Sequence, residues 1–171
     1  LPGWSAHALD AAPEAVVAIH RDYCAAGAVV HTANTFRTKR RTFPHDWQRL
    51  AQKAVALARG AIPAGQRVAG SISPLEDCYR PDLSPAERDP TGTRTEHAEL
   101  AVELAAACVD VLLVETFPHV GEALIALDAC LATGVETWVS FTAGYRADLV
   151  APAAIAAAAC GASKRGAKAV L

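Results

Sequence analysis

The sequence predicts an α/β fold of the (β/α)8 TIM-barrel type, with about half of the barrel within residues 1–171. Helical and strand patterns alternate along the chain, and this repeat builds a parallel sheet with helices outside it. Polar residues recur where the predicted strands end, which is where barrel enzymes carry their chemistry. Four strands and the start of a fifth are predicted, whereas a closed barrel has eight strands in roughly 250 residues. No glycine-rich phosphate-binding motif follows the first strand, which argues against nucleotide-binding folds.

The helices are predicted from apolar residues at helical spacing and from residues typical of helix ends. Pro13 stands in the first turn of the first helix and Gly27 ends it. Gly60 ends the second helix in the same way. The predicted helices span residues 12–28, 46–61, 95–108, 120–134 and 151–167.

The strands are predicted from short apolar runs between these helices. The clearest run is Val111–Val114, which is typical of a strand buried on both faces and leads directly into Glu115. The proline-rich residues 75–93 are expected to form a long loop. The predicted strands span residues 28–36, 67–74, 109–116 and 136–144, and a fifth begins at 168–171.

The composition is that of an ordinary globular domain. Sixteen basic and 18 acidic residues give a net charge of −2, so no nucleic-acid partner is expected. No apolar run has the roughly 18 residues of a membrane span, and no signal peptide is recognised at residue 1. We therefore expect a cytoplasmic protein without a membrane partner.

Cysteine and histidine patterns predict no metal site. The five cysteines are scattered, none is in a CxxC motif, and they are interpreted as small buried apolar residues. The six histidines lack zinc-protease spacing, and His31 and His97 are interpreted as structural. The basic run Arg37–Arg41 lacks interleaved aromatic residues and is interpreted as a solvated loop. No catalytic or metal-ligating residue is therefore assigned.

The polar residues at the strand ends are the candidates for ligand binding. Glu115 follows a continuous apolar run, which favours a site at the end of the sheet over a helix cap or a surface carboxylate. Asn34 and Thr35 could equally organise a turn through hydrogen bonds to the backbone. The hydroxyl groups at these ends are better interpreted as satisfying loop hydrogen bonds; they belong to Ser71, Ser73, Ser140 and Thr142.

Several of these segments resemble the homocysteine S-methyltransferase family, and the likeness covers essentially the whole chain. The matching motifs, in family order and spacing, are "WSAHAL", "IHRDYCAAGAVVHTANTF", "VAGSISP", "VDVLLVET" and "TWVSFTAG". The resemblance implies a zinc-dependent barrel that methylates homocysteine to methionine. It also implies three zinc-binding cysteines, none of which matches a cysteine of this sequence, and a first strand that would precede residue 1.

The resemblance also assigns substrate-binding roles. Glu115 matches the strand-end glutamate that contacts the substrate ammonium, and Thr35 falls where the family binds the substrate carboxylate, with Asn34 beside it. Ser140 lies at the equivalent end of a later strand. The implied partners are homocysteine and a small methyl donor, of which S-methylmethionine and S-adenosylmethionine are favoured. A homo-oligomer is possible.

Two other functions compete with this one. The chain could be a non-catalytic fragment or an interaction module of such a barrel that lacks the metal site. A Schiff-base aldolase would need a lysine at the end of a strand. Lys168, the lysine considered for that role, lies at the beginning of a predicted strand, so the aldolase ranks low.

Overall fold

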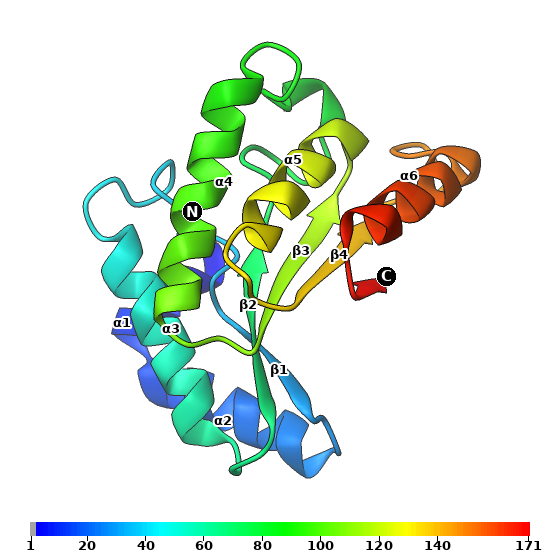
Figure 1. Ribbon diagram of the computed structural model, residues 1–171. Helices are drawn as coiled ribbons and strands as arrows, with labels where there is room; N and C mark the ends of the chain where they lie inside the picture. The colour runs from blue at the N-terminus through cyan, green and yellow to red at the C-terminus, as the bar shows by residue number, and fades with distance from the viewer. Residues whose placement is uncertain (1–2) are drawn as a thin grey trace.

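The computed structural model describes residues 3–171 and contains one five-stranded sheet (Figure 1). All four strand pairs are parallel, and the strands lie side by side in the order of the sequence. The strands are β1 Val30–Ala33, β2 Arg67–Ile72, β3 Val111–Phe117, β4 Thr137–Phe141 and β5 Ala169–Val170. This arrangement confirms the predicted α/β class and the parallel sheet, including the start of a fifth strand.

Helices connect the strands, and α3, α4, α5 and α6 pack on the same face of the sheet (Figure 1). The first helices of the chain, α1 and α2, pack against α3 rather than between two strands. The α-helices are α1 Ala8–Ala11, α2 Pro13–Ala25, α3 Trp47–Ala61, α4 Pro90–Ala106, α5 Val120–Leu131 and α6 Pro152–Arg165, and the 3-10 helices are η1 Trp4–His7 and η2 Pro81–Leu83. None of the helices within residues 3–171 has the length and apolarity needed to cross a membrane.

Local signals in the sequence explain where the main helices begin and end. Pro13, Pro90 and Pro152 occupy first turns, where the absent backbone N–H costs nothing. The Asp89 carboxylate caps α4 by accepting a hydrogen bond from the Gly92 backbone N–H. Gly166 ends α6 in the left-handed conformation, with φ of 113°.

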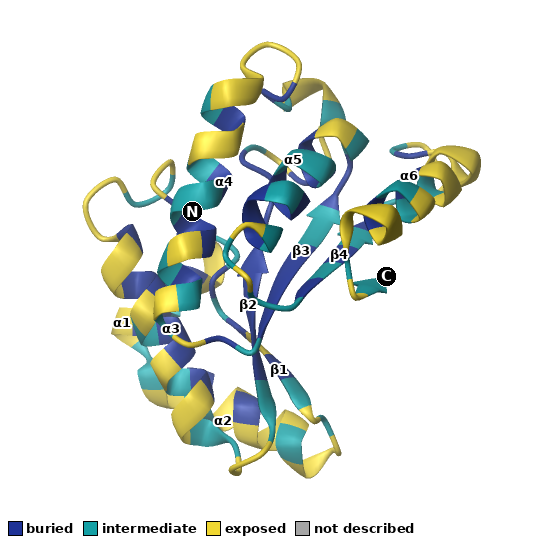
Figure 2. Ribbon diagram, in the orientation of Figure 1, coloured by how far each residue is buried: buried dark blue, intermediate teal, exposed yellow. Residues whose placement is uncertain are grey.

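The two faces of the sheet differ in what covers them. The main hydrophobic core lies between the sheet and the helices and includes Val68, Leu112 and Val139. A second, small cluster on the opposite face contains Ala69 and Leu113. Figure 2 shows the central strands largely buried and the outer sides of the helices exposed. The strand residues that do not face the helices therefore lie on this second face of the sheet.

Three sequence predictions need correction. Helix α4 begins at Pro90 and not at residue 95, because Asp89 and Pro90 form a cap inside the segment predicted as loop. Cys108 and Cys160 are exposed, so not every cysteine is a buried apolar residue. The basic run is not a solvated loop throughout, since Thr38 and Lys39 are buried and Lys39 Nζ is bonded to Ser73, just after β2.

Replacing Gly70 with alanine should lower the free energy of unfolding by about 1–3 kcal/mol. A Cβ there would lie 2.9 Å from Leu104 Cδ1 and 3.2 Å from Val109 Cγ1, inside the main core. Chemical denaturation measures the change. Gly60→Ala is the matched control, because a Cβ at that position in α3 meets no atom within 4 Å. The control should be neutral or stabilising, and an equal response from both variants would contradict the prediction.

Candidate functional site

The carboxyl ends of β1–β4 lie along one edge of the sheet, because all the strands are parallel. Polar residues follow or end each of these strands, as the sequence predicts. On the face without helices, two of them meet: Ser71 of β2 donates a hydrogen bond from Oγ to Glu115 Oε1 of β3 at 2.5 Å. This contact joins residues 44 positions apart and forms the centre of the candidate site.

A backbone irregularity accompanies Glu115 at this edge. The pairing of β3 with β4 shifts register between Val114 and Phe117, so an additional residue of β3 is left without a partner. Thr116, within this bulge, has φ of 64°, which is rare for a β-branched residue. Strained backbone of this kind clusters at functional sites, and here it accompanies the candidate carboxylate.

Glu115 is partly buried, and its environment favours the protonated form. Burial raises the pKa of Glu115, and the hydrogen bond from Ser71 only partly opposes that effect. A cationic group placed beside this carboxylate would oppose the effect of burial and favour the ionised form. The local electrostatics therefore suit an ammonium ligand.

Thr35 lies directly behind Ser71 and is fully buried. Its hydroxyl donates to the Ser71 carbonyl oxygen at 3.0 Å and accepts from the Ser71 backbone N–H at 2.8 Å. The side chain of Thr35 is therefore engaged with β2 and fixes the backbone that carries Ser71.

Asn34 connects the end of β1 to the first helical turn of the described chain. Its side-chain Nδ2 donates to the Ser5 carbonyl oxygen at 2.8 Å, and its Oδ1 accepts from the Ser5 hydroxyl at 2.8 Å. Asn34 thus ties the turn after β1 to Ser5.

Ser140 lies on β4 next to the bulge that contains Glu115. Its neighbours Val139 and Phe141 belong to the helix-covered core, so alternation places Ser140 on the other face with Trp138. The register Val114↔Val139 brings Ser140 alongside Glu115. Of the four predicted residues, Glu115 and Ser140 therefore share the open face, while Asn34 and Thr35 lie in the turn that follows β1.

Sequence reasoning missed a buried lysine behind this edge. Lys39 Nζ donates to Ser73 Oγ at 3.1 Å and to the Pro74 carbonyl oxygen. Burial, together with the nearby positive charge of Arg37, lowers the pKa of Lys39 to about 7. No pattern in the sequence distinguishes this lysine from the exposed bases around it.

Sequence reasoning also missed a buried carboxylate on α5. Glu122 is 1% exposed and accepts hydrogen bonds from the Leu75 backbone N–H at 2.7 Å, Ser84 Oγ at 2.6 Å and His97 Nε2 at 3.3 Å. Burial raises the pKa of Glu122, but these three donors outweigh it and leave the pKa below its usual value. Burial lowers the pKa of His97. Glu122 is therefore ionised, and its hydrogen bonds hold residues 75–84 in place. His97 is buried beside it, which agrees with the structural role predicted from the sequence.

The residues that the structure describes do not fit a complete zinc site. Within residues 3–171, no three side chains of His, Cys, Asp or Glu come together as metal ligands. The five cysteines are free.

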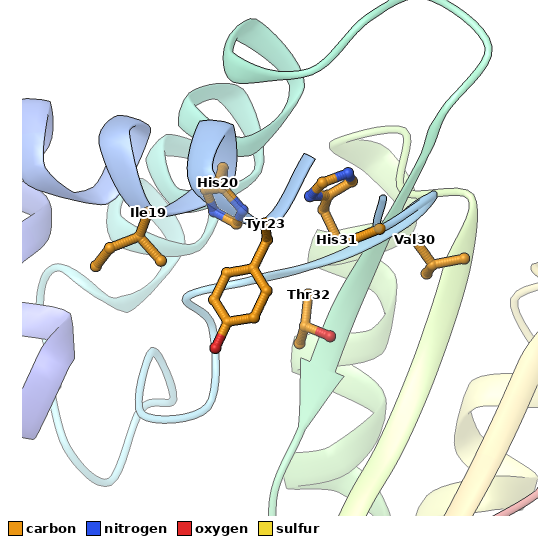
Figure 3. Close-up of a pocket in the computed structure, with 7 residues that line it drawn as sticks. Ile19, His20, Tyr23, Val30, His31 and Thr32 are labelled. Atoms are coloured by element: carbon orange, nitrogen blue, oxygen red, sulfur yellow. The ribbon is translucent and has the colours of Figure 1, made fainter. Parts of the chain in front are cut away.

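A separate cavity of about 350 Å³ lies between α2 and β1. Figure 3 shows the residues that line it, with Ile19, His20 and Tyr23 on the helix and Val30, His31 and Thr32 on the strand. The two imidazole rings lie 6.0 Å apart, and His31 Nε2 is hydrogen-bonded to Gln66 Oε1 at 2.8 Å. None of the four predicted site residues lines this cavity, so it is distinct from the candidate site.

This chain is similar to known proteins in both sequence and structure. The sequence model of the family described as homocysteine S-methyltransferase matches residues 2–170. The homocysteine methyltransferase MmuM from Escherichia coli is similar at 27% identity, with TM-scores of 0.72 in its metallated form and 0.73 in its oxidized form. These matches cover 83% of this chain and 56% and 55% of the MmuM chains. The apo form, at 24% identity and a TM-score of 0.60, is similar in fold. The search of curated proteins gave no significant match.

These matches show how much of a related protein the chain covers. It spans about half the length of the solved structures that it matches. The five parallel strands and their helices correspond to a segment of a TIM-barrel-like fold, as the sequence predicts.

Proposed function

The chain belongs to the homocysteine S-methyltransferase family, and on that premise we propose that it takes part in methyl transfer to the thiol of homocysteine, which yields methionine. The observation that carries this proposal is the contact between Glu115 and Ser71 at the carboxyl end of the sheet. A partly buried carboxylate at this end is suited to bind an ammonium group by a charge-assisted hydrogen bond.

The proposed roles follow from the position of each side chain. Glu115 accepts hydrogen bonds from the ammonium of homocysteine, while the Ser71 hydroxyl orients the carboxylate. By the family resemblance, the turn that contains Asn34 and Thr35 lies beside the carboxylate of the same substrate, where the Thr35 hydroxyl holds the backbone of Ser71, and Ser140 borders the amino acid from β4. These contacts bind and orient the substrate, so the four predicted residues act in substrate binding rather than in bond breaking.

A role for zinc is implied only by the family to which the chain belongs. A bound zinc ion would hold homocysteine as a thiolate near neutral pH. The ligands for it are not found together within residues 3–171, so no step of the transfer is assigned to a metal held by them. We propose S-methylmethionine or S-adenosylmethionine as the methyl donor. A cytoplasmic location and a homo-oligomer remain predictions of the sequence.

The second candidate is a non-catalytic fragment or interaction module of such a barrel. The observation that favours it is the face of the sheet without helices, where Trp138 remains only partly buried beside Leu113. Homocysteine binding without methyl transfer would support this role, whereas methionine formation from homocysteine and a donor would exclude it.

Replacing Glu115 with glutamine should weaken homocysteine binding by about 1.5–3 kcal/mol, or roughly 10- to 150-fold. The amide keeps the shape of the carboxylate but loses the charge that pairs with the ammonium. Isothermal titration calorimetry of the chain with homocysteine measures the dissociation constant directly.

Glu136→Gln is the matched control for this titration. Glu136 precedes β4 at the opposite end of the sheet, where it is paired with Arg67 at 3.1 Å. Its replacement should leave homocysteine affinity unchanged. Equal affinities for the wild-type chain and Glu115→Gln would remove Glu115 from the site.

A further inference from the structure

Hydrogen bonds join the loop after β1 to the end of β2, at the edge of the sheet where the candidate site lies. They involve six residues, which are Thr35, Phe36 and Lys39 of the loop, and Ser71, Ser73 and Pro74 at the end of β2 and just after it. We call these six residues the strand-end network. Ser71 and Thr35 already have a part in the proposed site, whereas the buried lysine has none.

Lys39 holds the outer part of this network together. It is only 5% exposed, and its Nζ donates to Ser73 Oγ at 3.1 Å and to the Pro74 carbonyl oxygen. Ser73 Oγ in turn donates to the Phe36 carbonyl oxygen at 2.6 Å. Burial of an ammonium group costs free energy, and here it lowers the pKa of Lys39 to about 7. An apolar side chain would fill this space without that cost, so the lysine indicates a role beyond packing.

The network continues along the backbone of β2 to the candidate carboxylate. Ser71 lies two residues before Ser73, and the Thr35 hydroxyl holds its backbone N–H at 2.8 Å and its carbonyl oxygen at 3.0 Å. The Ser71 side chain donates to Glu115 Oε1 at 2.5 Å. The end of β2 is therefore held at two points, by Thr35 at Ser71 and by Lys39 at Ser73. The position of the Ser71 hydroxyl against Glu115 depends on both.

We propose that Lys39 is a positioning residue, which acts through Ser71 to hold the Glu115 carboxylate in the orientation that binds the substrate ammonium. The hydrogen bonds of Lys39 go to Ser73 and Pro74, so its effect on the carboxylate is transmitted by the backbone at the end of β2. This inference rests on the proposed function, because the orientation of Glu115 matters for the reaction only if this residue binds the ammonium of homocysteine.

The pKa of the Glu115 carboxyl tests this role without any substrate. The hydrogen bond from Ser71 lowers that pKa against the effect of burial, so displacement of Ser71 should raise it. Lys39→Met should therefore raise the pKa of Glu115, measured by NMR titration of the carbon-13 signal of its side-chain carboxyl. Ser73→Ala removes the acceptor of Lys39 but keeps the ammonium, and it should shift the pKa in the same direction. Loss of positive charge cannot account for a shift in that second variant.

Calorimetric titration with homocysteine tests the consequence for binding. Lys39→Met should weaken binding roughly three- to tenfold, the size expected when one hydrogen bond is lost. In a Ser71→Ala background the same change should alter the affinity by no more than about twofold, because the hydroxyl that Lys39 positions is already absent. Arg40→Ala is the matched control from the same loop, since Arg40 is exposed and pairs with Glu99 at 2.9 Å. It should leave both the pKa of Glu115 and the homocysteine affinity at their wild-type values. Circular dichroism melting verifies that each variant is folded.

Two results would overturn the inference. The first is an unchanged pKa of Glu115 in folded Ser73→Ala, because a shift in Lys39→Met alone would then reflect the loss of charge. The second is an equal loss of homocysteine affinity from Lys39→Met with and without the Ser71 hydroxyl, since Lys39 would then support the fold in general. If Lys39→Met does not fold, Ser73→Ala decides both measurements. Failure of the proposed function is distinct, because the wild-type chain would then not bind homocysteine while the pKa of Glu115 still responded.

Discussion

Replacing Glu122 with alanine should lower the free energy of unfolding by about 3–5 kcal/mol, because it removes the acceptor of a buried polar network. The Leu75 N–H, the Ser84 hydroxyl and the His97 ring all donate to this carboxylate. The Leu75 N–H and the His97 ring would remain buried without an acceptor, while the half-buried Ser84 would lose a partner, and each buried donor left unsatisfied costs about 1–3 kcal/mol.

Urea denaturation of the wild-type chain and of the Glu122→Ala variant measures this effect. Glu122→Gln should lie between them, because its single amide oxygen replaces only part of the carboxylate. Glu87→Ala is the control for loss of a glutamate from an exposed position, since the Glu87 side chain is 86% exposed. It should change stability by no more than about 0.5 kcal/mol. A Glu122→Ala variant as stable as the control would show that the network contributes nothing.

The chain should become more stable as the pH rises from about 7 toward 10, and Lys39 should be the cause. Burial lowers the pKa of Lys39 from 10.5 to about 7 in the folded chain. Between these two values the unfolded chain holds a proton that the folded chain has released, so stability rises with pH. At about 1.36 kcal/mol per pH unit the gain is on the order of 5 kcal/mol as an upper limit. Below pH 7 both states are protonated and the cost of burying the charge is fully present.

The comparison of Lys39→Met with the wild-type chain isolates this group from others that titrate in the same range. Arg37, Glu122, Glu76 and Arg41 are the charged groups that act on Lys39, and all of them are retained in the variant. Denaturation at pH 6.5, 8 and 9.5 should give a rising stability for the wild-type chain and a much flatter one for Lys39→Met. Lys53→Met, which removes an exposed partner of Asp10, should keep the wild-type slope. Parallel curves for the wild-type chain and Lys39→Met would contradict the prediction.

Part of the candidate site was predictable because it depends on local pattern. The apolar run 111–114 identified β3, and a strand that ends in a carboxylate identified Glu115 as a residue at the edge of the sheet. The same reasoning located Thr35 and Ser140 at the ends of their strands. Hydrophobic periodicity and the residues typical of helix and strand ends involve positions close together in the chain. They can therefore be recognised in a single sequence.

Partners across the fold were not predictable in this way. Ser71 was interpreted as a loop hydroxyl, yet it donates to Glu115 from a strand 44 residues away in sequence. The bulge beside Glu115 arises from the register of β3 against β4, and register depends on how the two whole strands pack. A sequence pattern identifies the candidate residues, but the pairing of the strands determines which of them come into contact.

By itself, the sequence determined the order of helices and strands, the parallel sheet and the edge at which polar residues collect. Only the tertiary structure decided that Lys39 is buried while Arg40 beside it is exposed, and that Arg37 Nε is buried without an acceptor. Burial and charge pairing depend on segments that converge from distant parts of the chain. The pKa of Lys39 therefore follows from the surroundings that β2 and the loop after it provide, and not from its neighbours in the sequence.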